Sequence, residues 1–250
     1  MNAAALDIGV LGPALLAGLL VTATHVPLGQ QVLKRGIIFI DLAIAQIAGL
    51  GLMAAYTFGW EIGGWHMQAT AFIAALGGAL LLAWTERRWP QLQEALIGTL
   101  FVLAATGAIL LLSANPHGGE HLRDLMVGQI LWVSYEQLWP VAILYAVLLA
   151  LWFGGRCYQR TLPFYLIFAL AITASVQLVG VFLVFATLIV PAMFTSRLTS
   201  QRLLAGYLLS SFAYGAGLVA SALSDLPSGA LIVWSLAVLA VAGGMVIRRT

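Results

Sequence analysis

The residue whose type and position most strongly predict chemistry is Asp41, an acidic side chain inside a long apolar segment. Charged groups are costly within a membrane and commonly mark a functional site. His25 lies in the preceding apolar segment, and a short loop places both residues about 5–6 Å from one membrane surface, at roughly 1.5 Å per helical residue. We expect His25 and Asp41 to pair, either as a cation or proton site or as a structural hydrogen bond.

Three further polar residues lie in apolar segments. Gln46 follows Asp41 by five positions, about 140° around a helix, so the two do not share a face. Its carbonyl oxygen is a weak cation ligand, and its amide equally suits an interhelical hydrogen bond. Thr173 and Gln177 are one helical turn apart in a later segment, where they line a path or bond to neighbours.

One predicted outer loop carries metal-ligating residue types, His117, Glu120 and His121. Imidazole and carboxylate groups suit zinc and related metals. The spacing matches no compact site, and two glycines make the loop flexible. We expect a solvated polar turn or a weak site that receives a metal.

The chain lacks the motifs of a hydrolytic enzyme. A phosphate-binding P-loop needs a lysine after its glycines, and the single lysine, Lys34, follows Leu33. HExxH, GxSxG and cysteine clusters are also absent from the sequence. The sequence therefore predicts that the chain is not an enzyme and that any ATP it uses is hydrolysed on another subunit.

The composition indicates a membrane protein. Hydrophobic residues make up 62% of the 250 positions and charged residues 8%, with a mean hydropathy of +1.01, whereas soluble domains carry roughly 25% charge. This composition excludes a soluble enzyme and a disordered chain. It also excludes nucleic acid as a partner, because that needs clustered lysine and arginine.

Apolar runs long enough for membrane helices, about 20 residues each, predict an all-α polytopic bundle with eight or nine transmembrane helices in a single permease domain, residues 1–250. A run over 163–195 is too long for one ordinary span, and we expect two short helices that turn near Val179-Gly180, or one tilted helix with an extension. The other runs lie at 8–28, 37–58, 69–84, 95–113, 137–153, 204–223 and 229–247.

The arginines predict the orientation. Cytoplasmic loops are enriched in lysine and arginine. With the N-terminus outside and the C-terminus cytoplasmic, the inner loops hold every basic residue except Arg123, provided that the 163–195 run contributes two crossings or a re-entrant hairpin.

Two stretches resemble a known family. Residues 27–41 (PLGQQVLKRGIIFID) and 175–192 (SVQLVGVFLVFATLIVPA) are similar to the hallmark segments of the ABC-3 family, the permeases of bacterial ABC importers for zinc, manganese and iron. Shorter matches lie at 97–102, 127–134 and 225–230.

The resemblance implies a homodimer in the bacterial inner membrane, with a translocation path at the dimer interface. It implies two partners, a separate ABC ATPase and an extracytoplasmic metal-binding protein, and a transported divalent metal, zinc or manganese. It also implies that the ATPase docks on the segment after Pro191, with Ala192, Ser196, Arg197 and Ser200.

One position departs from the family pattern. The family motif places a metal-liganding histidine four residues after the aspartate, and here that position is Ala45. Either His25 supplies the ligand from the adjacent helix, or the cargo is a metal chelate that needs no imidazole. A proton-coupled secondary transporter or channel that works without an ATPase is the alternative function.

Overall fold

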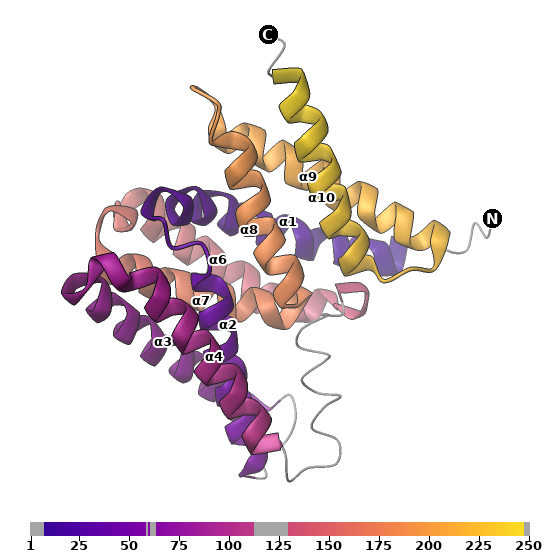
Figure 1. Cartoon of the computed structure of the whole chain (residues 1–250). Helices are drawn as coiled ribbons and strands as arrows, with labels where there is room; N and C mark the ends of the chain where they lie inside the picture. The colour runs from indigo at the N-terminus through magenta and orange to yellow at the C-terminus, as the bar shows by residue number, and fades with distance from the viewer. Residues whose placement is uncertain (1–7, 59, 61–63, 113–129, 248–250) are drawn as a thin grey trace. The chain divides into compact units, whose positions relative to one another are not determined.

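The computed structural model describes residues 8–58, 60, 64–112 and 130–247, and these residues form helices without any strand (Figure 1). The helices are α1 (Ile8–Arg35), α2 (Ile40–Thr57), α3 (Trp65–Arg88), α4 (Gln93–Leu112), α6 (Tyr135–Gly154), α7 (Thr161–Val179), α8 (Val181–Thr195), α9 (Arg202–Ser224) and α10 (Ser228–Ile247). Short 3-10 turns lie between them, η2 (Pro90–Leu92), η3 (Ile130–Trp132) and η4 (Cys157–Gln159).

The prediction of an all-α membrane bundle is confirmed. Within the described residues, 8 helices are long and apolar enough to cross a membrane, and α8 is a shorter apolar helix. Many large apolar side chains on these helices are exposed, which is what a lipid-facing surface requires. The predicted positions of the two termini relative to the membrane remain a prediction.

The long apolar run divides at Gly180, as expected. Its φ of 83° and ψ of 161° lie in a region that is essentially restricted to glycine. Because the backbone at this residue is not helical, α7 ends at Val179 and α8 begins at Val181. Two helices therefore replace a single tilted span.

The first span is longer than its apolar run. We expected it to end at residue 28, but α1 continues to Arg35 because residues 30–35 are mostly good helix formers. Gly36, with a φ of 71°, then ends the helix in the left-handed conformation. This correction changes the depth of His25, as described below.

The helices gather in two compact units. In the unit formed by residues 35–125 and 148–176, α2 packs against both α3 and α4 (Figure 1). Gly51 of α2 faces Ala74 of α3, and Gly78 of α3 faces Ile47 of α2, so small residues let these helices approach closely.

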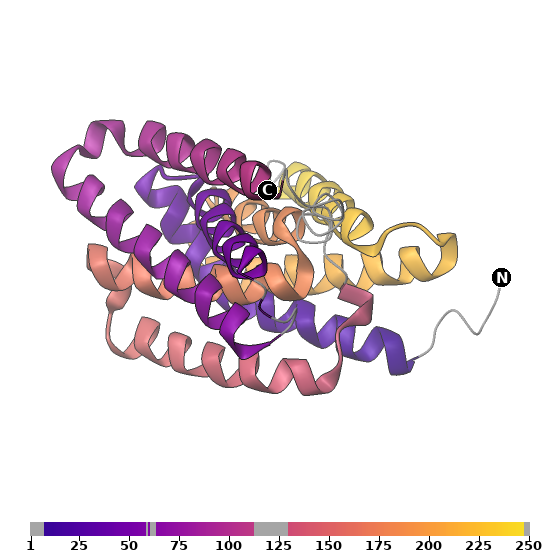
Figure 2. The ribbon, with the colours of Figure 1, turned by 90° about the horizontal axis from the view of Figure 1, so that it is seen from below.

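The other unit contains residues 1–34, 126–147 and 177–250, with α9 and α10 forming a hairpin and α8 packed on both (Figure 2). A Cβ on Gly29 of α1 would collide with the carbonyl oxygen of Leu188 in α8, and Gln30 donates a hydrogen bond to the Thr195 hydroxyl at 3.2 Å. The parts of the two family-like stretches that belong to this unit, residues 27–34 and 177–192, therefore pack against each other. A single domain over 1–250 remains a prediction.

Candidate substrate site and coupling segment

Asp41 lies in the first turn of α2 and is 1% exposed. The apolar run that predicted this helix begins at residue 37, but α2 begins only at Ile40. The backbone N–H groups of Asp41 and Leu42 are near the carboxylate, yet neither oxygen makes a well-formed hydrogen bond to a described residue. The positive end of the helix favours a carboxylate here. Burying a carboxylate without hydrogen-bond partners nevertheless costs free energy. Binding of a cation would offset this cost.

Gln46 lies on the same helix and is also buried, with 5% exposure. It is five residues beyond Asp41, so the two side chains leave α2 on different sides. This burial fits both predicted roles of Gln46, in a transport pathway or in an interhelical hydrogen bond.

His25 is fully buried in α1, ten residues before the end of the helix at Arg35. The Nδ1 atom lies 2.9 Å from the Val21 carbonyl oxygen and 3.0 Å from the Thr24 hydroxyl. Because a carbonyl only accepts, Nδ1 carries the proton and Nε2 keeps its lone pair. Nε2 has no hydrogen-bond partner in the described part of the chain, so it is free to bind a metal or proton.

The depth argument for pairing His25 with Asp41 was wrong. It assumed that His25 lies three residues from the end of its helix, and the helix extends seven residues further. The two residues belong to different compact units, and their pairing remains a prediction.

Thr173 and Gln177 lie one turn apart on α7, as expected. Thr173 is 1% exposed and Gln177 is half-buried. The Thr173 hydroxyl and the Gln177 amide nitrogen both lack a hydrogen-bond partner among the described residues. Such unsatisfied groups suit the wall of a polar path.

The predicted loop site of His117, Glu120 and His121 falls outside the described residues. Within the part of the chain that the structure describes, no three histidine, cysteine or acidic side chains come together to hold a metal ion. A site made by this chain's described residues must therefore use fewer such ligands.

The predicted coupling segment follows α8. Ser196, Arg197 and Ser200 are exposed, and the Ser196 hydroxyl donates to the Met193 carbonyl at 2.7 Å. Ala192 is 1% exposed and packs near Gly29 of α1, which places it inside the unit and away from a docking surface.

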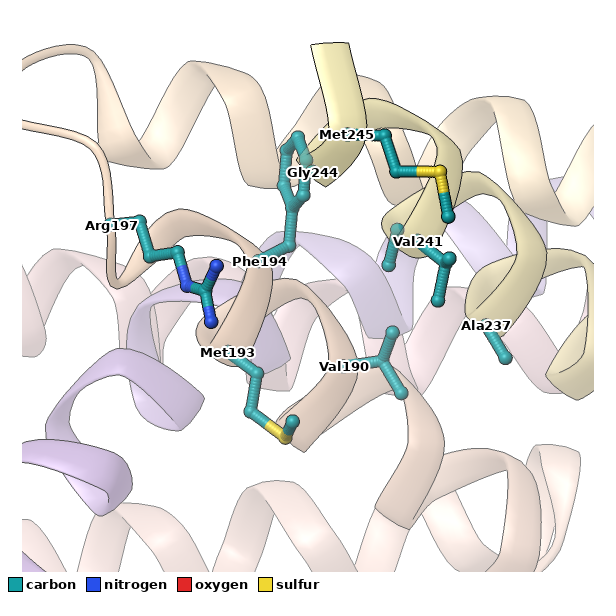
Figure 3. A pocket seen from close by; sticks show the side chains of 9 residues that line it. Val190, Met193, Phe194, Arg197, Ala237, Val241, Gly244 and Met245 are labelled. Atoms are coloured by element: carbon teal, nitrogen blue, oxygen red, sulfur yellow. The ribbon is translucent and has the colours of Figure 1, made fainter. Parts of the chain in front are cut away.

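A pocket of about 440 Å³ adjoins this segment, between the C-terminal halves of α8 and α10 (Figure 3). Phe194 points toward Gly244 of α10, and Arg197 lies at the α8 side of the pocket. The phenyl ring is close enough to Gly243 that an added Cβ would lie 2.9 Å from it. The end of α8 therefore packs against the C-terminal half of α10.

Sequence reasoning missed a charged cluster around Arg35. Its Nη1 donates to the two carboxylate oxygens of Glu86 at 2.9 and 3.3 Å, and Nη2 donates to the Tyr158 carbonyl at 3.2 Å. The guanidinium carbon lies 4.3 Å from the centroid of the Phe164 ring. All four residues belong to the same compact unit, in which these contacts fix Arg35 against α3 and α7. The sequence identified Arg35 only as a cytoplasmic charge.

Gln93 at the start of α4 is a second missed residue, and it is 3% exposed. Its amide donates to the Leu82 carbonyl at 3.0 Å and to the Tyr165 hydroxyl at 2.8 Å, and its oxygen accepts from the Thr85 hydroxyl at 2.9 Å. These bonds fix the start of α4 against α3 and α7. A polar residue at the end of an apolar run was the available signal.

The fold and the site define a multi-pass membrane protein with buried polar groups inside its bundle, which is the architecture of a transport subunit. The chain belongs to the ABC-3 family, described as the ABC 3 transport family, which matches residues 7–156 and 156–247. It is a permease subunit of an ABC transporter, resides in the bacterial inner membrane and is not a catalytic enzyme.

The chain is similar to one curated protein in sequence and to two solved structures in fold. The manganese transport system membrane protein MntC of Halalkalibacterium halodurans is 28% identical over 253 residues, covering 91% of this chain and 84% of that protein. The fold matches PsaBC from Streptococcus pneumoniae in complex with Fab, with a TM-score of 0.76, 18% identity, and coverage of 97% of this chain and 95% of that chain. It also matches a metal-chelate type ABC transporter in an inward-facing conformation, with a TM-score of 0.67, 16% identity, and coverage of 95% and 85%.

Proposed function

We propose that this permease imports a divalent metal ion (zinc, manganese or iron) or a metal chelate. The observation that carries the proposal is the buried carboxylate of Asp41, whose two oxygens lack hydrogen-bond partners among the described residues. Such a group in a membrane bundle binds a cation or a proton. Family membership and the metal transport named for the similar proteins favour the metal.

The polar residues of the bundle supply the rest of the pathway in this proposal. Gln46, Thr173 and Gln177 offer neutral oxygen donors, and Nε2 of His25 offers a nitrogen donor. The loop with His117, Glu120 and His121 receives the metal on the outer side. Imidazole and carboxylate donors bind zinc and manganese, so these groups fit such a cargo.

The energy comes from a separate ATPase, and an extracytoplasmic metal-binding protein delivers the cargo. The exposed residues Ser196, Arg197 and Ser200 dock the ATPase on the cytoplasmic side. ATP binding then moves α8, and α10 follows because Phe194 packs on it. Two copies of the chain form a homodimer with the path between them. Rigid-body movement of packed helices is an established way to switch access.

The cellular metal content tests this function. Bacteria grown under metal starvation, with and without this gene, are compared by elemental mass spectrometry, together with a strain that lacks the ATPase. We expect one metal to fall equally in both mutants, because neither subunit transports alone. An unchanged metal content in both mutants would refute a metal cargo.

A further inference from the structure

Glu94 of α4 lies at the start of α2, beside the turn that carries Asp41. Its Oε1 accepts a hydrogen bond from the backbone N–H of Phe39 at 3.3 Å, and Phe39 is the residue that precedes α2. The Phe39 side chain cannot accept hydrogen bonds as an N-cap side chain does, and Glu94 instead accepts from the backbone N–H of Phe39 itself. The start of α2 therefore has an acidic side chain of its own, Asp41, and one from α4, Glu94, which bonds to the backbone two residues before Asp41.

Three carboxylate oxygens remain unsatisfied at this place. Both oxygens of Asp41 and Oε2 of Glu94 are buried without a hydrogen-bond partner among the described residues. Because Glu94 bonds to the backbone of Phe39, two residues before Asp41, the two carboxylates lie at the same end of α2. Two negative charges near one another repel, so a cation bound between them would lower the electrostatic free energy of the site.

The protein supplies no such cation from the described residues of this unit. Arg35, six residues before Asp41, directs its terminal nitrogens to Glu86 and to the Tyr158 carbonyl. The site is also held rigidly, because Gln93, the residue before Glu94, bonds to both α3 and α7. A cation-binding site requires negatively charged groups that are held in place and have no other partner.

We propose that Asp41 and Glu94 together hold the transported ion, and that their oxygen donors select manganese over zinc. Manganese prefers six oxygen ligands, whereas zinc prefers nitrogen and sulfur ligands. Glu94 thereby takes the place of a nitrogen ligand at Ala45, and water completes the coordination. A proton shared between the two groups would satisfy only two of the three oxygens. The inference rests on the proposed function, since it specifies the cargo and its ligands.

Manganese binding to the purified complex of permease and ATPase tests the inference. The loss of the free Mn²⁺ signal in electron paramagnetic resonance measures the affinity. The variants are Asp41→Asn, Glu94→Gln and a control, Glu136→Gln, an exposed acidic residue in the first turn of α6. Glutamine at position 94 keeps an oxygen that can accept a hydrogen bond from the Phe39 N–H, so this bond survives while the charge is lost.

We expect Asp41→Asn and Glu94→Gln each to weaken Mn²⁺ binding by about tenfold or more, and Glu136→Gln to bind like the wild type. Zinc should displace manganese from the wild type less readily than from Glu94→His, which restores a nitrogen ligand. A purely structural Glu94 would change the melting temperature and leave the affinity unaltered.

Three results separate the inference from the proposed function. Wild-type Mn²⁺ affinity in Glu94→Gln would overturn the inference. That result is also the one expected if the two carboxylates share a proton and bind no metal. A wild-type complex that transports metal without binding Mn²⁺ here would overturn the inference and leave the function standing. A wild-type complex that neither binds nor transports a metal would overturn both.

Discussion

Replacing Gly51 by alanine should force α2 and α3 apart. An added Cβ would lie 2.7 Å from the Cβ of Ala74 and 2.9 Å from the carbonyl oxygen of Thr70. Ordinary contact begins at 3.4 Å, so the first distance is about 0.7 Å too short. Both neighbours are fixed to the α3 backbone and cannot rotate away. Overpacking of this kind costs about 1–3 kcal/mol.

Gly49→Ala is the matched control, because Gly49 lies on the same helix with nothing within 4 Å of an added Cβ. Both variants gain about 0.5–1 kcal/mol from alanine's helix propensity, so their difference isolates the overpacking. For a chain of this size, 1 kcal/mol shifts the melting temperature by about 2–4 °C.

Thermal unfolding of the purified complexes, followed by tryptophan fluorescence, measures this difference. We expect Gly51→Ala to melt roughly 2–12 °C below Gly49→Ala. Equal melting temperatures would refute the close approach of α2 and α3.

Three further predictions concern charged residues. Asp41→Asn should reduce metal uptake by about tenfold or more while the complex still assembles, as measured by uptake and size-exclusion chromatography. Arg35→Gln and Glu86→Gln should each lower the free energy of unfolding by about 1–3 kcal/mol, and the double variant by less than the sum, as measured by chemical denaturation. Arg197→Ala should weaken copurification of the ATPase and lower uptake, because it removes an exposed charge from the docking segment.

Each of these predictions has a control. Asp225→Asn changes an exposed acidic residue with a φ of 56°, which asparagine tolerates, and uptake should stay normal. Normal uptake by Asp41→Asn would contradict the role of Asp41. Arg88→Gln changes an exposed arginine at the end of α3 and should affect neither stability nor coupling. Additive losses at Arg35 and Glu86 would contradict their pairing, and full ATPase binding by Arg197→Ala would contradict docking there.

The sequence predicted features that depend on local chemistry. The break at Gly180 followed from an overlong apolar run with a glycine, and the structure shows a backbone conformation there that requires glycine. The burial of Asp41 followed in the same way from one charge within an apolar segment.

Two of the features that were missed differ in origin, one being local and the other dependent on a contact between helices. The end of α1 was missed because apolar patterning stops at residue 28, although residues 30–35 still favour a helix. Glu94 was missed because its chemistry depends on the start of α2, which is more than fifty residues away along the chain. Without knowledge of this contact, the sequence places Glu94 only at the edge of an apolar run.

Transport by the reconstituted protein tests the central claim most directly. The chain is placed in proteoliposomes either alone or with its ATPase and binding protein, and Mn²⁺ or Zn²⁺ accumulation is measured with and without ATP. We predict accumulation only when the ATPase and ATP are both present, because this chain carries no P-loop. Metal accumulation by the chain alone, driven by a proton gradient, would contradict the account and identify a secondary transporter.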